Sequence, residues 1–527
     1  MKNKQVITIV AVSIIGISVV LFLFIKQKES QTGHTVTDSF VSNTVGLATA
    51  KSQETVSLQN GDTYLLSAEI VKKAINGREV KMLAYNGSIP GPLFKVPQGA
   101  EITLKFTNNT YVDTTVHSHG VRVDNKFDGV PDVTQDPVKP GQSFTYKLKF
   151  PDVGVYWYHP HIREDYAQEL GLYGNFIVTP ENSDYWAEVD REEALFLDDI
   201  LVENGQIASF DETTIDHTLM GRFGNAVLVN GDENYSLSVK QGERVRFYIT
   251  NSANTRVFNF AIPDMRMKLV GGDNGKYERE EWVDGVIISP SERAVIEIWF
   301  DQDGTYEIQN QTPDKTYALG SINVEEVVVT TSYFLVAREN KDFIESINTL
   351  RPLFTKPADK SLNITVDLLG NMMSSMGGHM MPDGTMMGGA VMGTPEKIEW
   401  EDDMEAMNKE STTNTVKWKL VDQETKYENL DIDWQFNKGD MIKIKIFNDD
   451  KSMHPMQHPI HIHGQRFLVL STNNTQTNNF VWKDTALIQT GDTVELLVQM
   501  DNPGDWVIHC HIPEHMEAGM MSQFEVI

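Results

Sequence analysis

Residues 99–108 read GAEITLKFTN, and two later stretches repeat the pattern of this segment: 242–251 (GERVRFYITN) and 439–448 (GDMIKIKIFN). Each copy runs from Gly to Asn in nine steps and carries apolar residues three, five and seven positions after the Gly. This alternation predicts a β-strand with one buried face. Glycine and asparagine are typical turn residues, so they mark the two ends of each strand.

A second element repeats in the same order. A Pro-Gly, Pro-Ser or Thr-Gly pair is followed thirteen residues later by Gly154, Gly304 or Gly504, with alternating strands in between. Two spacings that recur in three copies predict an all-β chain of three tandem antiparallel β-sandwich domains. We expect these domains to span residues 58–182, 183–330 and 331–527.

The composition is that of an ordinary globular protein. The chain has 527 residues, of which 40% are hydrophobic and 23% are charged, enough for about three domains with cores of their own. Lys+Arg number 45 and Asp+Glu 74, so the formal net charge is −29. Such an acidic surface repels nucleic acid and attracts cations. The single cysteine, Cys510, excludes an internal disulfide framework.

Residues 6–25 form an uncharged apolar run with lysines on both flanks. As a helix this run would span about 30 Å, the thickness of a bilayer's hydrocarbon core. We therefore expect residues 1–28 to be an uncleaved signal anchor, with a cleaved signal peptide as the alternative. The polar, Ser/Thr-rich stretch 29–57 predicts a flexible tether. The soluble part would then lie outside the cytoplasm, either anchored to the cell membrane and facing outward or secreted after cleavage.

The histidines are concentrated in four short motifs, which hold ten of the fourteen. The middle repeat carries QNQ at 309–311, where the outer repeats carry HPH at 159–161 and HCH at 509–511. A purely structural role would have recurred in all three copies, so we expect the first and third domains to meet and share a metal site. Residues i and i+2 of a strand face the same way, so each His-x-His pair presents two imidazoles to one point. The motif histidines are His117, His119, His159, His161, His458, His461, His463, His509, His511 and His515.

Cys510 forms a distinct set with His458, His515 and Met520. Two imidazoles, a thiolate and a weak thioether are the ligands of a trigonal blue-copper site, which transfers single electrons. Zinc is the alternative metal, and an inert buried thiol is the alternative role for Cys510. Neither alternative explains the eight further imidazoles.

The eight other motif histidines suit a cluster of metal ions. At two or three imidazoles per metal they would hold three ions. His509 and His511 flank Cys510 directly, so a short covalent path joins the cysteine site to any metal that these two bind. One-electron input beside a multi-metal centre suits the four-electron reduction of O2 to water.

All four motifs, in this order and on three domains, resemble those of the multicopper oxidase family over about residues 58–527. The resemblance implies cupredoxin-like Greek-key domains, a copper cluster between the first and third, and no copper ligands in the second. It also implies four copper ions per chain: one type 1, one type 2 and a type 3 pair. The implied ligands are His458, Cys510, His515 and Met520 for type 1; His117 and His461 for type 2; His119, His159 and His511 for one type 3 copper; and His161, His463 and His509 for the other.

Bacterial members of this family carry an acid, eleven residues after the first histidine of the first motif, that feeds protons to the cluster. Asp128 holds that position, with a simple turn-forming Asp-Gly pair as the alternative. A second acid often follows the last type 1 histidine, but Met516 occupies that place here. The expected catalytic residues are thus Asp128 and the electron path of Cys510, His509 and His511.

Residues 372–392 read MMSSMGGHMMPDGTMMGGAVM, with eight methionines in 21 positions, and belong to a predicted insert, 372–407, in the third domain. The glycines and the lack of any period exclude a core helix and favour a loop. Thioethers suit Cu(I), and the segment resembles the Met-rich insert of bacterial copper-efflux oxidases; a plain low-complexity loop is the alternative. Substrate copper is expected at Met372, Met373, Met376, His379, Met380, Met381, Met386 and Met387, and at His454 and Met456.

Together, the residues and the resemblance predict an extracytoplasmic multicopper oxidase with a monomeric catalytic unit. It would oxidise Cu(I) to Cu(II), reduce O2 to water and give copper tolerance. A laccase-like oxidase of phenols, Mn(II) or Fe(II) is the second hypothesis, and a copper-binding protein without turnover is the third. The expected partners are O2, a small cation or phenol, and the membrane through the N-terminal segment, but no nucleic acid.

Overall fold

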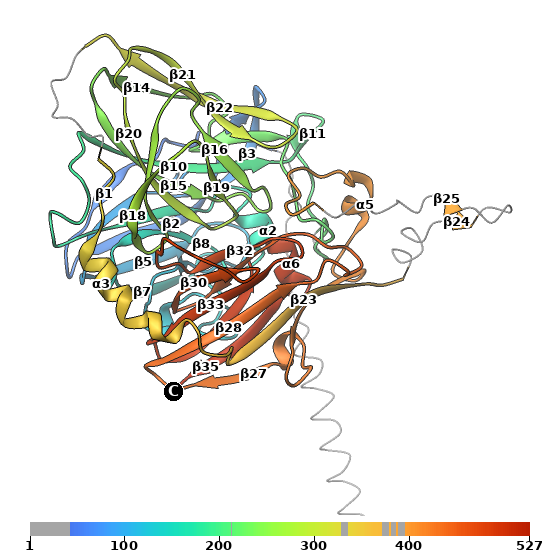
Figure 1. Cartoon of the computed structure of the whole chain (residues 1–527). Coiled ribbons are helices and arrows are strands. Elements are labelled where there is room, and N and C mark those ends of the chain that lie inside the picture. Colours follow the sequence, from blue (N-terminus) through green and yellow to red (C-terminus); the bar gives the residue numbers. More distant parts are fainter. Residues whose placement is uncertain (1–42, 212, 328–335, 371–378, 381–385, 388–395) are drawn as a thin grey trace, which may run out of the picture.

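The computed structural model of this chain describes residues 43–211, 213–327, 336–370, 379–380, 386–387 and 396–527. The predicted signal anchor, residues 1–28, lies outside the described residues. Within those residues no helix is long and apolar enough to cross a membrane. The described chain forms three β-sandwiches in sequence order, so the predicted all-β class and threefold repeat are confirmed (Figure 1).

The first sandwich consists of a four-stranded sheet, ordered β3-β2-β5-β7, and a five-stranded sheet, ordered β1-β4-β9-β8-β6. Its elements are β1 (Thr55–Ser57), β2 (Thr63–Ile75), β3 (Arg78–Tyr85), β4 (Leu93–Pro97), β5 (Glu101–Asn108), β6 (His117–His119), η1 (Asn125–Phe127), β7 (Ser143–Lys149), β8 (Gly154–His159), α2 (Glu164–Ala167) and β9 (Gly174–Thr179).

The middle sandwich pairs a six-stranded sheet, ordered β13-β10-β15-β20-β17-β18, with a five-stranded sheet, ordered β14-β22-β21-β16-β19. Its elements are β10 (Arg191–Ile200), the hairpin β11 (Val202–Glu203) and β12 (Gln206–Ile207), β13 (Ala226–Val229), β14 (Tyr235–Lys240), β15 (Arg244–Asn251), β16 (Phe258–Ala261), β17 (Met267–Gly272), β18 (Gly275–Val283), β19 (Val286–Ile288), β20 (Arg293–Trp299), β21 (Gly304–Gln311) and β22 (Thr316–Glu325).

The third sandwich has a six-stranded sheet, ordered β26-β23-β28-β33-β30-β31, and a five-stranded sheet, ordered β27-β35-β34-β29-β32. Its strands are β23 (Lys360–Leu368), β26 (Val416–Asp422), β27 (Asp433–Phe436), β28 (Asp440–Asn448), β29 (His458–Ile462), β30 (Arg466–Thr472), β31 (Thr475–Gln476), β32 (Thr485–Ile488), β33 (Thr493–Met500), β34 (Gly504–Cys510) and β35 (Met521–Val526). The remaining elements are α3 (Lys341–Leu350), η2 (Arg351–Leu353), β24 (His379–Met380), β25 (Met386–Met387), α5 (Glu405–Glu410), η3 (Asn429–Asp431) and α6 (Pro513–Glu517).

The repeated Gly-to-Asn segments form the same strand in each sandwich. These strands, β5, β15 and β28, pair in parallel with β2, β10 and β23 and antiparallel with β7, β20 and β33. The sheets are therefore mixed, whereas the repeat predicted antiparallel sandwiches. A parallel pair needs a crossover connection, and here the chain visits the opposite sheet between the two paired strands.

The predicted one-sided burial holds for β5, where Ile102, Leu104 and Phe106 are completely buried and alternate with more exposed residues. In β15, by contrast, all eight residues are buried. The second face of β15 packs against the first sandwich, because Tyr248 joins Val155 in one apolar cluster. The alternating pattern predicts that the second face of β15 is exposed to solvent, but in the structure the first sandwich covers it.

The asparagine that ends each repeat is a clamp between two loops. The side-chain Nδ2 of Asn108 donates to the carbonyls of Val112 and Val138, at 2.7 and 2.8 Å. The same two bonds recur at the other sandwiches, from Asn251 to Arg256 and Ile288 (2.8 and 2.9 Å) and from Asn448 to Met456 and Ile488 (2.7 and 3.1 Å). The second carbonyl always lies two residues before the repeated Pro-Gly, Pro-Ser or Thr-Gly pair, so the clamp explains why the two repeated elements occur together.

The predicted tether, residues 29–57, is wrong at its C-terminal end. Lys51 N–H donates to the Gly87 carbonyl at 2.8 Å, and β1 pairs in parallel with β4. Residues 49–57 therefore belong to the first sandwich, while residues 29–42 lie outside the described part of the chain. Backbone hydrogen bonds hold this edge segment, and they leave little trace in side-chain pattern.

Replacing Asn251 by Ala removes the clamp of the middle sandwich and leaves two buried carbonyls without their donor. We expect the free energy of unfolding to fall by about 2–4 kcal/mol, measured by urea unfolding of the metal-free protein. The control is Asn323→Ala, because the Asn323 amide donates to Ser236 on an exposed surface; its effect is expected to stay within about 0.5 kcal/mol. Equal effects of the two variants would contradict the clamp.

Candidate metal centre

The four histidine motifs lie on neighbouring strands of two sandwiches. In the first, β6 pairs with β8 so that His117 faces His159. In the third, β29 pairs with β34 so that His461 faces His509. Each sandwich thus offers its imidazoles from two paired strands of one sheet.

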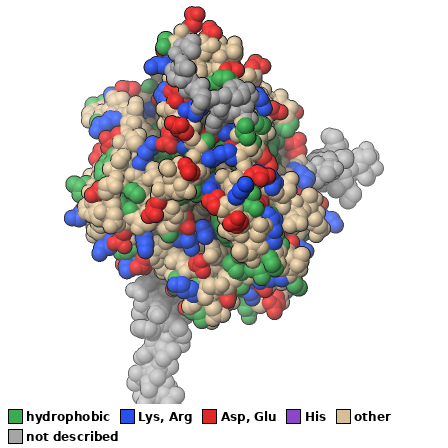
Figure 2. Space-filling view, turned by 60° about the vertical axis from the view of Figure 1, so that its left-hand side comes forward, with side chains coloured by type: hydrophobic (Ala, Val, Ile, Leu, Met, Phe, Trp, Pro, Cys, Tyr) green, Lys and Arg blue, Asp and Glu red, His purple; other side chains and the backbone are tan. Residues whose placement is uncertain are grey.

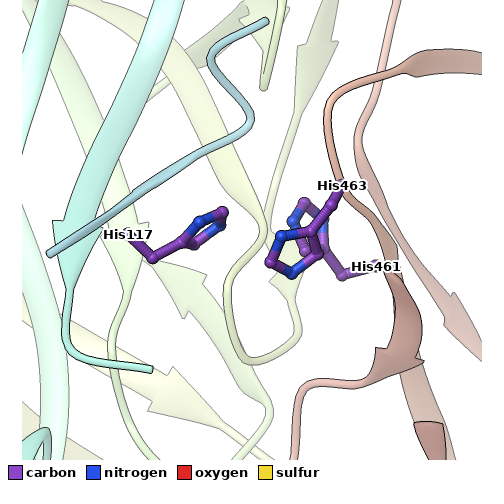
Figure 3. Close-up of side chains that lie close together, drawn as sticks. All are labelled: His117, His461 and His463. Carbon is purple, nitrogen blue, oxygen red and sulfur yellow. The ribbon is translucent and has the colours of Figure 1, made fainter. Parts of the chain in front are cut away.

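The two groups of imidazoles meet between the first and third sandwiches. The rings of His119 and His461 stack with their centroids 3.7 Å apart, and those of His117 and His463 lie 4.1 Å apart. Figure 3 shows His117 from one sandwich pointing at His461 and His463 from the other. The cluster is closed off from solvent, and the face drawn in Figure 2 shows no histidine among its described side chains.

Several sets of three ligand atoms in this space are close enough to share one ion. Within each set the ligand atoms all lie within 4.8 Å of one another. Two of these atoms, His463 Nε2 and His509 Nε2, lie 2.9 Å apart. The sets drawn from the cluster include His117 with His461 and His463, His117 with His119 and His159, and His161 with His463 and His509.

Hydrogen bonds outside the cluster fix which nitrogen of most rings faces inward, whereas neither nitrogen of His511 has a hydrogen-bond partner. His117 Nδ1 donates to the Asp128 carbonyl at 2.7 Å, His159 Nδ1 to the Pro160 carbonyl at 2.8 Å, and His461 Nδ1 to the Asp484 carbonyl at 2.8 Å. Each opposite nitrogen, Nε2, therefore carries a lone pair, and it is buried with no hydrogen-bond partner. Such outer bonds are typical of metal-ligating histidines.

His119 is oriented the other way round. Its Nε2 donates to Asp484 Oδ1 at 3.0 Å, so Nδ1 is the nitrogen left buried without a partner. His463 Nδ1 donates to Asp128 Oδ2 at 2.8 Å, and His509 Nδ1 donates to the Cys510 carbonyl at 2.9 Å. His161 Nδ1 has the Glu164 carboxylate 3.3 Å away. The lone pairs thus point inward from opposite sides, which fits a cluster of soft to intermediate cations.

Burial keeps these rings neutral. Loss of hydration, reinforced by neighbouring imidazoles, lowers the pKa of six cluster histidines well below the ordinary value: His119, His159, His161, His461, His463 and His511. The pKa of His509 falls to about 4, chiefly through burial. Neutral imidazoles are metal ligands and protonated ones are not, so the electrostatics favour metal binding at neutral pH.

A second, smaller site surrounds Cys510. Its Sγ lies 3.6 Å from His458 Nδ1 and 3.9 Å from His515 Nδ1, and the two nitrogens are 3.3 Å apart. Two ligands about 2.0–2.3 Å from one ion, at tetrahedral to trigonal angles, lie about 3.3–3.8 Å apart. The three atoms therefore fit one metal ion between them.

The surroundings of this smaller site are apolar. Met520 is fully buried in the same core cluster as Cys510, and its carbonyl accepts the Cys510 N–H at 3.1 Å. Burial raises the pKa of the Cys510 thiol and lowers that of His458 to about 3. A metal ion that binds here must therefore displace the thiol proton.

Four residues near the two sites carry no signal in the sequence. Trp418 lies with its ring 4.4 Å from that of His515, and Trp157 stacks on His159 at 4.1 Å. Asp484 and Glu164 are acids that, like Asp128, contact cluster histidines. All four lie outside the motifs. Trp157 and Glu164 are two and three residues away from His159 and His161 along the chain, whereas Asp484 and Trp418 come close only through the docking of separate strands.

Asp128, the predicted proton donor, is buried between the two sandwiches. Its carbonyl and its carboxylate hold His117 and His463 respectively, and its Oδ1 has no hydrogen-bond partner. It is therefore more than a turn residue. Met516 is also buried. Of the two nearest acids, Glu514 is buried, which raises its pKa to about 8, whereas Glu517 is exposed.

The residues predicted to bind substrate copper are only partly described. Met456 is completely buried in the core of the third sandwich. His454 is also buried, its Nε2 has no partner, and burial lowers its pKa to about 4. Strand β24 pairs antiparallel with β25, which brings the backbone of His379 and Met380 beside that of Met386 and Met387. Met372, Met373, Met376 and Met381 lie outside the described residues.

An acidic cavity of about 860 Å3 opens between the middle sandwich and segment 396–409, which follows the Met-rich stretch. Eight carboxylates and three cationic side chains line it. The acids are Glu203, Asp314, Glu396, Glu399, Glu401, Asp402, Asp403 and Glu405, and the cations are Arg256, Lys315 and Lys409. His217 is one of the residues that line the cavity. The carbonyl of the next residue, Thr218, accepts the Trp418 Nε1–H at 2.8 Å. The cavity is thus one loop away from the indole that covers the Cys510 site.

Comparison with known proteins gives one consistent result. Three family models, each described as multicopper oxidase, match residues 68–183, 182–339 and 395–527. A multicopper oxidase of Staphylococcus aureus is 25% identical over 476 residues, which cover 88% of each chain. Copper resistance protein A of Escherichia coli is 24% identical and covers 86% of this chain and 90% of its own. In fold, a multicopper oxidase of Campylobacter jejuni described as a metallo-oxidase has a TM-score of 0.64 at 23% identity, covering 92% of this chain and 98% of that one.

Replacing Cys510 by Ser keeps the size of the side chain but removes the thiolate. We expect the visible thiolate-to-copper absorption to disappear and one copper per chain to be lost, while the cluster histidines, whose outer hydrogen bonds remain, keep theirs. Absorption spectra and copper analysis after reconstitution measure both. The control is Ser522→Ala on the neighbouring strand, which is expected to change neither. A complete loss of copper from the cysteine variant would show that the two sites do not form independently.

Proposed function

The chain belongs to the multicopper oxidase family, and from that premise we propose that it oxidises Cu(I) to Cu(II) outside the cytoplasm and so protects against copper. As a member of the family it is a copper-dependent oxidoreductase that uses O2 and a reducing substrate. The observation that carries the choice of a small cation is the acidic cavity one loop from the Cys510 site. The name of the copper resistance relative agrees with this choice.

Four copper ions are proposed, in two places. His458, Cys510, His515 and Met520 would hold the type 1 ion. The cluster would hold one type 2 ion at His117 and His461 and a type 3 pair, one ion at His119, His159 and His511 and the other at His161, His463 and His509. When bound, copper would accept single electrons from the substrate at Cys510, and four such electrons, passed on to the cluster, would reduce one O2 to two molecules of water.

The chain itself provides the connection between the two places. Cys510 and His509 are consecutive residues of β34, and His509 Nδ1 donates to the Cys510 carbonyl at 2.9 Å. This bond closes a ring between the cysteine backbone and the imidazole. Electrons could thus pass from the thiolate to the cluster along the covalent bonds between Cys510 and His509, or across the hydrogen bond between the Cys510 carbonyl and the His509 ring.

Asp128 is proposed to hand a proton to the cluster. Its Oδ2 accepts from His463 Nδ1, while Oδ1 is buried, makes no hydrogen bond and lies 3.4 Å from His117 Nδ1. A proton held at Oδ1 therefore lies beside imidazoles from both sandwiches. The acid also orients His117 through its carbonyl, so it combines positioning with proton transfer.

Burial of the type 1 imidazoles argues for a small substrate. His458 and His515 are completely buried, and the ring of Trp418 covers both, with centroids 4.7 and 4.4 Å away. A phenol ring cannot touch either imidazole unless this cover moves. Laccase-like oxidation of phenols is therefore the second candidate.

A monomeric enzyme that is anchored to the membrane also remains part of the proposal.

Deletion of residues 372–392 tests the copper substrate directly. If the methionines deliver Cu(I), kcat/KM for Cu(I) is expected to fall about tenfold or more, equivalent to roughly 1.4 kcal/mol of lost transition-state stabilisation. Oxidation of a bulky phenol is expected to stay equal or rise, because a phenol does not depend on delivery by thioethers. Oxygen uptake with each substrate measures the two constants. Unchanged Cu(I) kinetics in the deletion variant would refute the copper substrate.

Glu399 makes cation delivery depend on pH. Burial, with Glu396 and Asp403 nearby, raises the pKa of Glu399 to about 7. The carboxyl is mostly neutral below this value and gains charge as the pH rises through it, so KM for Cu(I) is expected to fall by about threefold to tenfold between pH 6 and pH 8.

Two variants check that this pH dependence comes from Glu399. Glu399→Gln is expected to make KM nearly constant across the same range. Glu405→Gln, which neutralises an exposed acid of the same cavity, is the control: it is expected to raise KM at every pH and to keep the pH dependence. An unchanged pH profile in Glu399→Gln would exclude Glu399 as its source.

A further inference from the structure

The middle sandwich has no cluster histidine, yet one of its side chains reaches the cluster. Arg293, the first residue of β20, is completely buried along its side chain. Its Nε donates to the Val155 carbonyl of the first sandwich at 2.8 Å. Its Nη1 donates to the Ser291 carbonyl at 2.7 Å and to Asp484 Oδ1 of the third sandwich at 2.7 Å, and its Nη2 donates to Asp484 Oδ2. A single guanidinium therefore ties together all three sandwiches.

Asp484, which Arg293 holds in place, accepts hydrogen bonds from two imidazoles. Its Oδ1 accepts the Nε2–H of His119, from the first sandwich, at 3.0 Å. Its backbone carbonyl accepts the Nδ1–H of His461, from the third sandwich, at 2.8 Å. These two rings stack on each other, so one residue sets the direction of both inward-facing nitrogens.

The contact is specific for arginine. Two parallel N–H donors of a guanidinium match the two oxygens of a carboxylate, whereas a lysine ammonium offers a point charge without this fork. Arg293 also lies beside Asp273, whose Oδ1 accepts the Arg293 N–H at 2.8 Å. Lys483 Nζ contacts the other oxygen of Asp273 at 3.2 Å. Asp484 and Asp273 thus both face cations. Removing the Arg293 guanidinium would leave Asp484 without a counter-charge.

The backbone of the first histidine motif approaches this ion pair closely. A Cβ on Gly120, which follows His119, would lie 2.1 Å from Asp484 Oδ2 and 3.1 Å from Arg293 Nη2. Gly120 also has a φ of +78°, which favours glycine. The absence of a side chain here lets the ion pair sit against the cluster.

We propose that Arg293 is a positioning residue of the copper cluster: it holds Asp484, and through it the imidazoles of His119 and His461. The middle sandwich is then a working part of the metal centre, although it contributes no ligand. This inference rests on the proposed copper ligands and is independent of the substrate, because none of its contacts involves the cavity or the Cys510 site.

The test is the copper content of Arg293→Gln and Arg293→Lys after reconstitution and dialysis against a graded chelator. Loss of an outer partner of a metal ligand typically lowers metal affinity about 10–100-fold. We expect that loss for cluster copper in Arg293→Gln, with a smaller one in Arg293→Lys, together with an altered type 2 EPR signal. The visible absorption of the Cys510 site is expected to remain, because His458, Cys510 and His515 make no contact with Arg293 or Asp484.

Two further variants keep the outcome decisive. Arg244→Gln is the matched control: Arg244 lies on β15 of the same sandwich and forks onto Asp190 at 3.0 and 3.2 Å, away from the cluster, so full copper binding is expected. Asp484→Asn, which keeps the size of the side chain, is expected to reproduce the copper loss even if Arg293→Gln fails to fold. Cluster affinity within twofold of the parent in both Asp484→Asn and Arg293→Lys would overturn the proposal. Parallel loss of cluster and Cys510 copper, with an equal fall in the Tm of the metal-free protein, would also overturn it, because the role would then be structural.

Discussion

Eight imidazoles buried between two β-sandwiches are the constraint on which the rest of this structure depends. Burial lowers the pKa of rings such as His119, His161 and His461, and hydrogen bonds to carbonyls and carboxylates determine which nitrogen most of the rings turn inward. Those acceptors come from both sandwiches, as Asp128 and Asp484 show. The site is therefore a property of the interface, and neither sandwich contains it alone.

The middle sandwich shows how one fold serves two purposes. It keeps the strand order and the asparagine clamp of its neighbours, but it has amides where they have imidazoles. Its contribution lies at its surfaces: Tyr248 packs against the first sandwich, residues 217–221 contact the third near Trp418, and Arg293 reaches both. It acts as a spacer that sets the distance and angle between the two ligand-bearing partners.

Much of this could be predicted from the sequence, because strand alternation and motif spacing are local. The repeated strands, their buried residues such as Ile102 and Leu104, and the convergence of histidines on strand ends all follow from a period of two. Glu164 follows His161 by three residues, but no motif distinguishes it from other acids near a histidine. Asp484 and Trp418 could not be found, since each reaches its site only through the docking of separate elements. The same reason accounts for the two-sided burial of β15, the parallel strand pairs and the docked residues 49–57. Periodicity describes a strand's own faces and contains no information about what covers them.

The asparagine clamp has a further consequence for how such a protein changes over time. The loop that it closes is four residues long from Asn108 to Val112, five from Asn251 to Arg256 and eight from Asn448 to Met456. Because closing a somewhat longer loop costs little extra entropy, insertions in this loop leave the two sheets of the sandwich intact. The longest of the three loops is the one that holds His454 beside the Cys510 site. New substrate chemistry can thus be grafted onto an unchanged scaffold, one loop at a time.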